Sequence, residues 1–460
     1  MSDRHAPNGF RTFLILWGTQ SLSVFGSALT YFAMTIWMTQ ALYPRPDQQP
    51  QLAFALALVG LAGMIPALLM APIAGAWVDR HDRKRTMIVA DFANVLLSAL
   101  LVALIASGRL ELWMLLVLVV AFGTLQAFHG AAFDTSYAML VPEHLLPRAN
   151  GMMQSMWALS NVISPAIAAA IITLPALARQ GLLPAGLAGW LAGLRDGSAL
   201  AIAVDGATFL VAAVTLLFLV IPSPVRTDLN TVGGKPQKSL WADIREGAVY
   251  IWRRPPLLWL LGTFAVSNLT GAPLQMMHPL VLKFTLARDL AARGLEFAPA
   301  MALLAAVAGI GGVAGGALIS AWGGLKSRRI LGVLIPVLIA GLFQVCYGLS
   351  PLFYLSVAAV AICDAMVPIL NAHSQTIWQT QTPRELQGRV FAVRRVIAQC
   401  TAPLGTVLAG WAGGLIDPGR VVAIAGGIMV CFCVVQLFNP QLLKVEDKAL
   451  LDGMAARTGD

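Results

Sequence analysis

Long apolar stretches separated by short clusters of charge constrain this chain more than any other feature of its sequence. The stretches are about 20–30 residues long, whereas a helix needs roughly 20 apolar residues to cross the hydrocarbon core of a bilayer. Only 12% of the 460 residues are charged and 58% are hydrophobic, against about 25% charged in ordinary soluble domains. The composition therefore excludes a soluble enzyme and a disordered protein, and it indicates a polytopic membrane protein.

The apolar runs between charge, Pro and Gly breaks predict twelve transmembrane helices and hence an all-α fold. The first six are expected at residues 10–42, 52–77, 86–107, 111–139, 149–172 and 199–221. The second six are expected at residues 257–284, 297–322, 329–349, 352–381, 389–415 and 421–438. Residues 174–198 are apolar but broken by Pro and Gly, and we expect a surface loop with an interfacial segment there.

This count divides the chain into four parts. They are an N-terminal six-helix bundle (1–221), a cytoplasmic central loop (222–256), a C-terminal six-helix bundle (257–440) and a cytoplasmic tail (441–460). In the central loop, Leu240, Ile244, Ala248 and Ile251 fall at helical spacing. That spacing predicts a helix on the inner leaflet that tethers the two bundles.

The distribution of Lys and Arg gives the expected orientation. With the N-terminus in the cytoplasm, only 8 of the 31 Lys and Arg residues lie outside, as the positive-inside rule requires. Because the number of spans is even, the C-terminus is then expected in the cytoplasm as well. The net charge of +9 is explained by this asymmetry and calls for no nucleic-acid partner.

The two halves of the chain echo one another. Val141-Pro142 follows the fourth span and Thr382-Pro383 follows the tenth, while Ser164-Pro165 and Ala402-Pro403 lie inside the fifth and eleventh spans. An even number of crossings returns the chain to the same side, so the two six-helix units are predicted to be parallel repeats. Repeats of this kind place a cavity between two halves that rock against each other.

Several motifs resemble those of a known family. The segment from Gly75 to Arg85 (GAWVDRHDRKR) is similar to the loop between helices two and three of the major facilitator superfamily, Gly-x-x-x-Asp-Arg-x-Gly-Arg-Lys/Arg, with Asp82 in place of the second Gly. Leu140-Val141-Pro142-Glu143 and Gly388-Arg389-Val390-Phe391 resemble its macrolide-efflux branch of 12-helix drug exporters.

This resemblance implies a secondary transporter, and not an enzyme. It would export a lipophilic or amphipathic small molecule, such as a macrolide-like drug, by alternating access in exchange for protons. It would act as a monomer in a bacterial-type plasma (inner) membrane, with small-molecule substrate, protons and lipid as its partners. A siderophore or secondary-metabolite exporter, or a lipid-handling membrane protein, are the alternatives.

The loop motif suggests a gate. An anion such as Asp79 can accept hydrogen bonds from the first amides of a neighbouring helix, and Arg83 can reach a carboxylate, for which Asp134 is the candidate. In the family this loop locks the halves together on the cytoplasmic side. The resemblance therefore assigns gating to Gly75, Asp79, Arg80, Arg83 and Asp134. A simple topology anchor is the alternative.

The fifth span contains a second motif. Ser160 to Pro165 resembles the antiporter pattern Gly-x-x-x-Gly-Pro, with Ser in place of each Gly. Small residues let helices approach closely, and Pro removes a backbone hydrogen bond so that a helix can bend. Ser164, Pro165 and Pro403 are therefore candidates for helix flexing, with ordinary small-residue packing as the alternative.

Ionisable residues at bilayer depth are costly and mark functional positions. Asp364, close to the middle of the tenth span, is the first candidate for proton coupling, and the others are Asp205, His129 and Asp91. For Asp91 the sequence favours a partner of the cytoplasmic arginines over a proton site. A fixed hydrogen-bond anchor at Asp205 and a packing role for His129 are the alternatives for the other two. Arg394 and Arg395 lie near the inner end of the eleventh span.

Uncharged polar residues in the cavity-forming spans could line an amphipathic substrate site. The candidates are Gln20, Asn161, Asn268, Gln275 and Asn371. Hydrogen bonding between helices is the alternative for each of them. The sequence holds no Gly-x-x-x-x-Gly-Lys-Ser/Thr loop and no clustered metal ligands, so no cofactor and no metal is expected.

Overall fold

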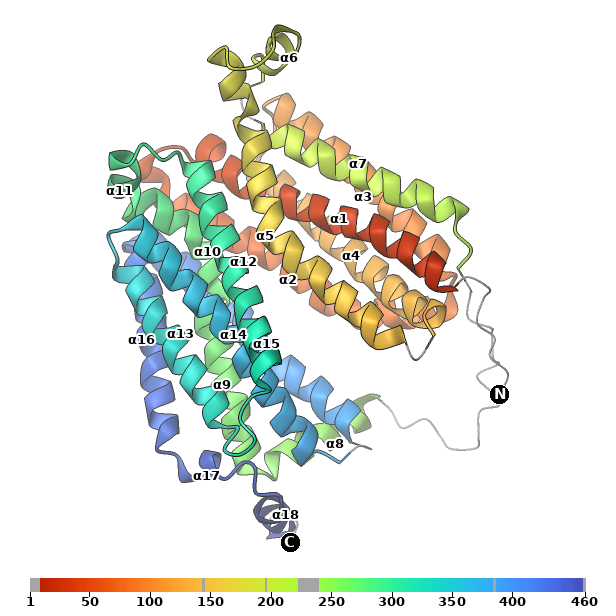
Figure 1. Cartoon of the computed structure of the whole chain (residues 1–460), viewed down its shortest axis with the longest axis vertical. Coiled ribbons are helices and arrows are strands. Elements are labelled where there is room, and N and C mark those ends of the chain that lie inside the picture. Colours follow the sequence, from red (N-terminus) through yellow and green to blue (C-terminus); the bar gives the residue numbers. More distant parts are fainter. Residues whose placement is uncertain (1–8, 143–144, 195–196, 222–239, 384–385, 458–460) are drawn as a thin grey trace. The chain divides into compact units, whose positions relative to one another are not determined.

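The computed structural model describes residues 9–142, 145–194, 197–221, 240–383 and 386–457, and within them it consists of helices joined by turns and short connections, without a strand (Figure 1). Twelve of its helices are long and apolar enough to cross a membrane. This confirms the predicted all-α fold with twelve transmembrane helices. The described residues fall into two compact units, residues 9–221 with Glu296–Ala306, and residues 240–295 with 307–457.

The first unit is a bundle of long antiparallel helices. Its elements are α1 (Gly9–Trp37), which continues as a π-helical turn (Met38–Leu42), α2 (Gln49–Arg80), α3 (Arg83–Ala106), α4 (Leu112–Leu140), α5 (Leu146–Arg179), the short α6 (Ala185–Leu191) and α7 (Ser198–Phe218). Helix α1 packs on α5 and α7, and α3 packs on α4 and α7. Five helices therefore contribute to the interior in which polar side chains of this unit are buried.

The second unit repeats this plan. Its elements are α8 (Leu240–Trp252), α9 (Pro255–Gly271), α10 (Pro273–Leu280), α11 (Ala287–Ala292), α12 (Phe297–Trp322, which begins among the residues grouped with the first unit), α13 (Leu331–Leu349), α14 (Phe353–Gln381), α15 (Gln387–Leu415), α16 (Pro418–Leu437), α17 (Pro440–Leu443) and α18 (Lys448–Arg457). Helix α13 packs on α14 and α16, and α15 packs on α8 and α9.

The fifth span is longer than predicted. Helix α5 continues past residue 172 to Arg179, although Pro175 lies inside it. The expected surface loop therefore begins about two turns later, and α6 forms within it at the far end of α5 (Figure 1). A proline removes only one backbone hydrogen bond, which a long helix can tolerate.

One interhelical hydrogen bond occurs at equivalent positions in both units, so the two units repeat each other in atomic detail. The Ser160 hydroxyl of α5 donates to the Val24 carbonyl of α1 at 3.5 Å, and the Thr401 hydroxyl of α15 donates to the Ala265 carbonyl of α9 at 2.8 Å. Each residue of the second pair lies 241 positions after its counterpart in the first, 401 against 160 and 265 against 24. The two units therefore share one scaffold contact in one register.

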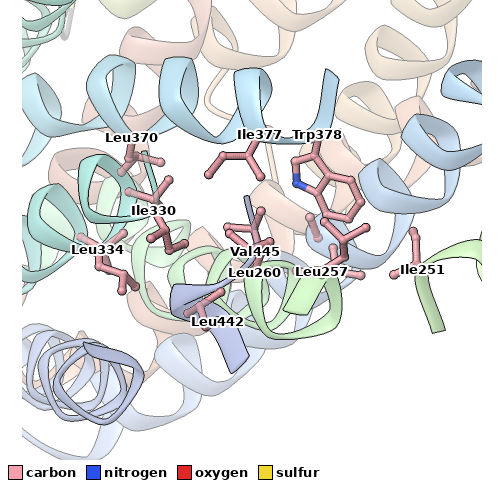
Figure 2. Close-up of a cluster of buried hydrophobic side chains, with 14 of the residues drawn as sticks. Ile251, Leu257, Leu260, Ile330, Leu334, Leu370, Ile377, Trp378, Leu442 and Val445 are labelled. Atoms are coloured by element: carbon pink, nitrogen blue, oxygen red, sulfur yellow. The ribbon is translucent and has the colours of Figure 1, made fainter. Parts of the chain in front are cut away.

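Helix α8 and the end of the chain are part of the core of the second unit. Figure 2 shows Ile251, Leu257, Trp378, Leu442 and Val445 in one buried cluster. The Tyr250 hydroxyl donates to the Gln381 carbonyl at 2.6 Å. The helix predicted at Leu240–Ile251 thus exists, but it is packed against protein, and a description as a helix lying on lipid is incomplete.

Small residues bring α12 and α14 into close contact. An added Cβ at Gly315 would collide with the Ala365 carbonyl, and one at Gly311 would collide with the Ala361 carbonyl. At the neighbouring Gly316, the nearest atom to an added Cβ is the Cβ of Pro368, at 4.0 Å. The backbone contact therefore depends on one face of α12.

We predict that Gly315→Ala and Gly316→Ala differ sharply. Gly315→Ala forces the two backbones apart and should lower stability by about 1–3 kcal/mol, as overpacking does. Gly316→Ala should change it by less than about 0.5 kcal/mol. Thermal unfolding of the two purified variants in detergent tests this, and equal melting temperatures would contradict the close approach.

Asp289 ties α11 to the start of α14. Its carboxylate accepts hydrogen bonds from Arg293 Nε and from the backbone N–H of Phe353, both at 2.8 Å. These donors, with the hydrogen bond from Arg293 first, hold the pKa of the Asp289 carboxyl below its usual range. Because the folded-state pKa is depressed, the contribution is present above the unfolded pKa of about 3.9 and is lost as the pH falls through the folded value.

We therefore expect Asp289→Asn to melt below wild type at pH 7, and the gap between the two to close below about pH 4. The Asn keeps an acceptor for the Phe353 amide, so the comparison isolates the charge. Melting curves of both proteins between pH 7 and pH 3.5 measure it. Asp47→Asn, on an exposed carboxylate, is the control; a gap that stays constant with pH would contradict the assignment.

Candidate functional site

A carboxylate and an imidazole lie together inside the first unit. Asp91 of α3 and His129 of α4 bring Oδ1 and Nε2 to 3.3 Å, and both residues are buried, with Asp91 fully inaccessible. Among the described residues, neither carboxylate oxygen of Asp91 has a hydrogen bond of good geometry. Since buried polar groups normally have such partners, this pair is an exception that calls for an explanation.

Further polar groups continue from Asp91 along the same face of α3. Asn94 and Ser98 follow at helical spacing, and both are buried. In the described part of the chain, Asn94 Oδ1 and Ser98 Oγ lack hydrogen-bond partners. From Asp91 to Ser98 the helix rises about 10 Å, so the polar face crosses a large part of the bundle.

The polar face of α3 ends beside a second buried carboxylate. Ser98 packs so closely on α7 that an added Cβ at Gly206 would lie 3.1 Å from Ser98 Cβ. The preceding residue, Asp205, is buried, and its Oδ2 accepts a 2.6 Å hydrogen bond from Thr30 Oγ1 of α1. Gly26 makes this approach possible, because an added Cβ there would lie 2.6 Å from Asp205 Oδ1.

The four sequence candidates for proton coupling thus fall into different surroundings. Asp91 lies against His129, so the favoured expectation that it pairs with the cytoplasmic arginines is wrong for this structure. Asp205 has the hydrogen bond expected of an anchor. Asp364 is in α14 of the second unit and is half-buried, with no ion pair or hydrogen bond of its side chain among the described residues.

The gating residues are only partly as expected. Arg83 is buried at the start of α3, and its Nη1 donates to the Thr135 carbonyl at 3.1 Å and contacts Met139 Sδ at 2.6 Å. The predicted ion pair with Asp134 is wrong for this structure, because the Asp134 side chain is exposed while Arg83 bonds the backbone of the next residue. The sequence placed Asp134 at the correct depth along α4, but the rotation of this helix about its axis turns the Asp134 side chain away from Arg83.

The other gating residues provide less structural support for a gate. Gly75 is in α2 with open space around it. Arg80 is exposed at the end of α2. The side chain of Asp79 lies outside the described residues.

We predict that Arg83→Ala destabilises the protein and that Arg80→Ala does not. Arg83→Ala removes a charge-assisted hydrogen bond between α3 and α4 and should cost about 1–3 kcal/mol, whereas the exposed Arg80 should cost less than about 0.5 kcal/mol. Melting temperatures in detergent measure both. Equal losses would mean that Arg83 acts only as a surface charge.

The serines of the fifth span bond to α1. Ser164 is fully buried, and its hydroxyl donates to the Phe25 carbonyl at 3.3 Å. Ser160 lies 3.3 Å from Ser164 and bonds to α1 as well. Pro165 and Pro403 both lie inside their helices, α5 and α15. In α15 a glycine, Gly405, takes the equivalent place, and the Leu269 carbonyl fills the space of its missing Cβ.

The candidate cavity residues divide by exposure. Gln20 is buried, and its Nε2 lacks a partner in the described chain. Asn268 Nδ2 donates to the Ala398 carbonyl at 2.9 Å, which is the interhelical alternative. Asn161, Gln275 and Asn371 are exposed on their helices.

Sequence reasoning missed Asn94, Ser98 and Thr30, which complete the polar interior of the first unit. The spacing of 91, 94 and 98 on one helical face was the available signal.

Sequence reasoning also missed Gln344 of the second unit, whose Nε2 donates to the Thr270 carbonyl at 3.0 Å. Both residues line an apolar cavity of about 180 Å³ among α9, α10, α13, α15 and α16.

The described residues contain no group of three or more His, Cys, Asp or Glu side chains that could hold a metal ion.

Comparisons with known proteins agree with this architecture. Residues 16–406 match the sequence pattern of the Major Facilitator Superfamily. Macrolide efflux protein A of Streptococcus pyogenes is 24% identical over 450 residues, covering 95% of this chain and 98% of that protein. Multidrug efflux pump Tap of Mycolicibacterium fortuitum is 27% identical over 409 residues, covering 85% and 88%.

Solved structures show the same fold at low identity. A bacterial homologue of the human lysosomal transporter Spinster superposes with a TM-score of 0.64 at 16% identity, covering 98% of each chain. The nucleoside transporter NupG superposes with a TM-score of 0.60 at 10% identity, covering 94% of this chain and 99% of that one.

Proposed function

Because the chain belongs to the Major Facilitator Superfamily, we propose that it exports a lipophilic or amphipathic small molecule by alternating access in exchange for protons. The observation that carries the proton step is the buried pair of Asp91 and His129, 3.3 Å apart between two transmembrane helices. Proton antiport needs a group inside the membrane that binds a proton from one side and releases it to the other. A carboxylate beside an imidazole supplies two such groups that share one proton.

The burial of Asp91 and His129 makes their contact functionally important. An isolated charge at this depth is costly, so Asp91 and His129 are stabilised either as an ion pair or with the proton placed to leave both neutral. Any change that separates α3 from α4 removes this compensation and favours a different protonation state. Proton occupancy and helix packing are thereby coupled, which is what antiport requires.

The polar face of α3 supplies a route for the proton. Asn94 and Ser98 have oxygen atoms without partners between Asp91 and the neighbourhood of Asp205. The Ser98 hydroxyl both accepts and donates and can therefore relay a proton, while Asn94 Oδ1, which only accepts, can hold a water that does so. We assign the route to the interior of the first unit, with Asp205 at its other end and Asp364 as the rival site.

We propose that the turn between α2 and α3 acts as the cytoplasmic gate. Arg83 anchors the start of α3 on α4, and Arg80 is exposed at the end of α2. In this proposal Arg80 pairs with an acidic partner in only one of the two conformations. Gly75, Asp79 and Asp134 belong to the same proposal through the family motif. Flexing at Ser164, Pro165 and Pro403 would let α5 and α15 bend as the gate opens.

The proposed substrate class follows the names of the relatives. Two of them are named for the efflux of macrolides or of several drugs, and the uncharged candidates Gln20, Asn161, Asn268, Gln275 and Asn371 suit an amphipathic ligand. A siderophore or other secondary metabolite, or a lipid, is the alternative cargo. We place both termini in the cytoplasm, on the positive-inside rule, and propose a monomer in a bacterial-type inner membrane.

Proton flux in inside-out vesicles tests the proposal. We expect erythromycin to dissipate an imposed pH gradient with wild type, and Asp91→Asn or His129→Gln to slow this by about tenfold or more, equivalent to about 1.4 kcal/mol. Substrate counterflow, which needs no net proton movement, should persist in both variants. Asp47→Asn is the control, because Asp47 is exposed and lies in the short segment between α1 and α2.

The other outcomes are equally informative. If Asp364→Asn abolishes dissipation and Asp91→Asn does not, the proton site lies in the second unit. If no variant changes dissipation, the proton step is wrong. If wild type accumulates erythromycin without dissipating the gradient, export stands and the coupling ion is a different one.

A further inference from the structure

We propose that Arg394 and Arg395 form a binding site for an oxyanion within the membrane-spanning part of α15. Arg394 lies five residues inside the span Arg389–Leu415, a depth of about 8 Å along the helix. An arginine at such a depth is normally paired with a carboxylate or reaches out to water. Arg394 is half-buried and has no carboxylate partner among the described residues.

The guanidinium of Arg394 is held by neutral groups. Its Nη1 donates to Gln375 Oε1 at 2.8 Å, and its Nη2 lies 3.3 Å from Ser374 Oγ. The rings of Trp378 and Phe264 lie 5.3 Å and 5.8 Å from its central carbon. These contacts hold the cation without neutralising it, and within the described residues they engage only two of the five N–H donors of the guanidinium.

Two carboxylates of the second unit have partners other than Arg394. Glu246 pairs with Arg389 at 2.8 Å, and Glu446 accepts from the Ile330 amide at 3.0 Å. Within the described residues, Arg394 has no ion pair. Arg395, the next residue, is exposed and adds a second positive charge. The adjacent positive charge of Arg395 repels that of Arg394, and an anion bound at Arg394 offsets this repulsion.

The fold does not require these charges. The equivalent positions in the first unit, 241 residues earlier, are Met153 and Gln154 on α5. The cationic pair is therefore specific to the second unit. A planar guanidinium with free N–H groups binds phosphate or carboxylate oxygens in pairs, which identifies the ligand as an oxyanion.

Two sources can supply such an oxyanion. The proposed orientation puts Arg394 at the cytoplasmic end of the bundle, within reach of a lipid phosphate of the inner leaflet. The other source is an anionic group on the transported molecule, which would favour an acidic metabolite over a cationic macrolide. The site itself does not depend on proton-coupled export.

The lipid source is tested without any transport. Purified full-length protein in detergent is titrated with dioleoylphosphatidylglycerol or with dioleoylphosphatidylcholine, and bound lipid is counted by native mass spectrometry. We expect wild type to prefer the anionic lipid and Arg394→Gln to bind it about tenfold more weakly. Arg394→Lys should recover part of the affinity, and Arg253→Gln, at an exposed arginine of the same unit, should match wild type.

The substrate source is tested in inside-out vesicles with erythromycin and an anionic tricatechol siderophore. A KM for the siderophore that rises about tenfold in Arg394→Gln, with erythromycin unchanged, assigns the site to cargo. Arg395→Gln repeats both tests should Arg394→Gln fail to fold. No preference for phosphatidylglycerol in wild type, together with no siderophore transport that depends on Arg394, overturns the proposal. Failure of export alone leaves the lipid measurement intact.

Discussion

A polar group inside a bilayer has no bulk water to bind, so its burial costs free energy unless another part of the protein supplies a hydrogen-bond partner. The interior of each unit is organised by this constraint. Hydroxyls bond to backbone carbonyls of the next helix, as Ser160 and Thr401 do. Backbones approach where glycine replaces a side chain, as at Gly315. Groups that remain without such partners are few, and they are where chemistry can occur.

The two units meet this constraint differently although they share a scaffold. The first buries an acid and an imidazole together, Asp91 with His129, and a second acid, Asp205, against a threonine hydroxyl. The second holds a cation, Arg394, among neutral oxygens and aromatic rings. The position equivalent to His129 in the second unit is Leu370. The shared framework therefore carries different ionisable groups in its two copies.

The sequence predicts most of the fold because a transmembrane helix is specified locally, by about 20 apolar residues between charges. It misplaces the end of α5, because Pro175 and the glycines after it are typical of a loop. The Asp91–His129 pair could have been found by depth, since one lies eight residues after the start of α3 and the other eleven before the end of α4. The same depth argument failed for Arg83 and Asp134, because helix rotation is set by packing across the bundle, which no single segment specifies.

The buried tail has a consequence for how the protein is made. Leu442, Val445 and Leu451 belong to the core that also holds α8, α9 and α14. The chain reaches these residues only after the other helices of that core, so the second unit cannot close its core until they have been made. Nearly all of the first unit is encoded before residue 222, and it can pack while the second unit is still on the ribosome. Synthesis therefore presents the membrane with a first bundle that can pack early and a second bundle whose core closes only when residues 442–451 arrive.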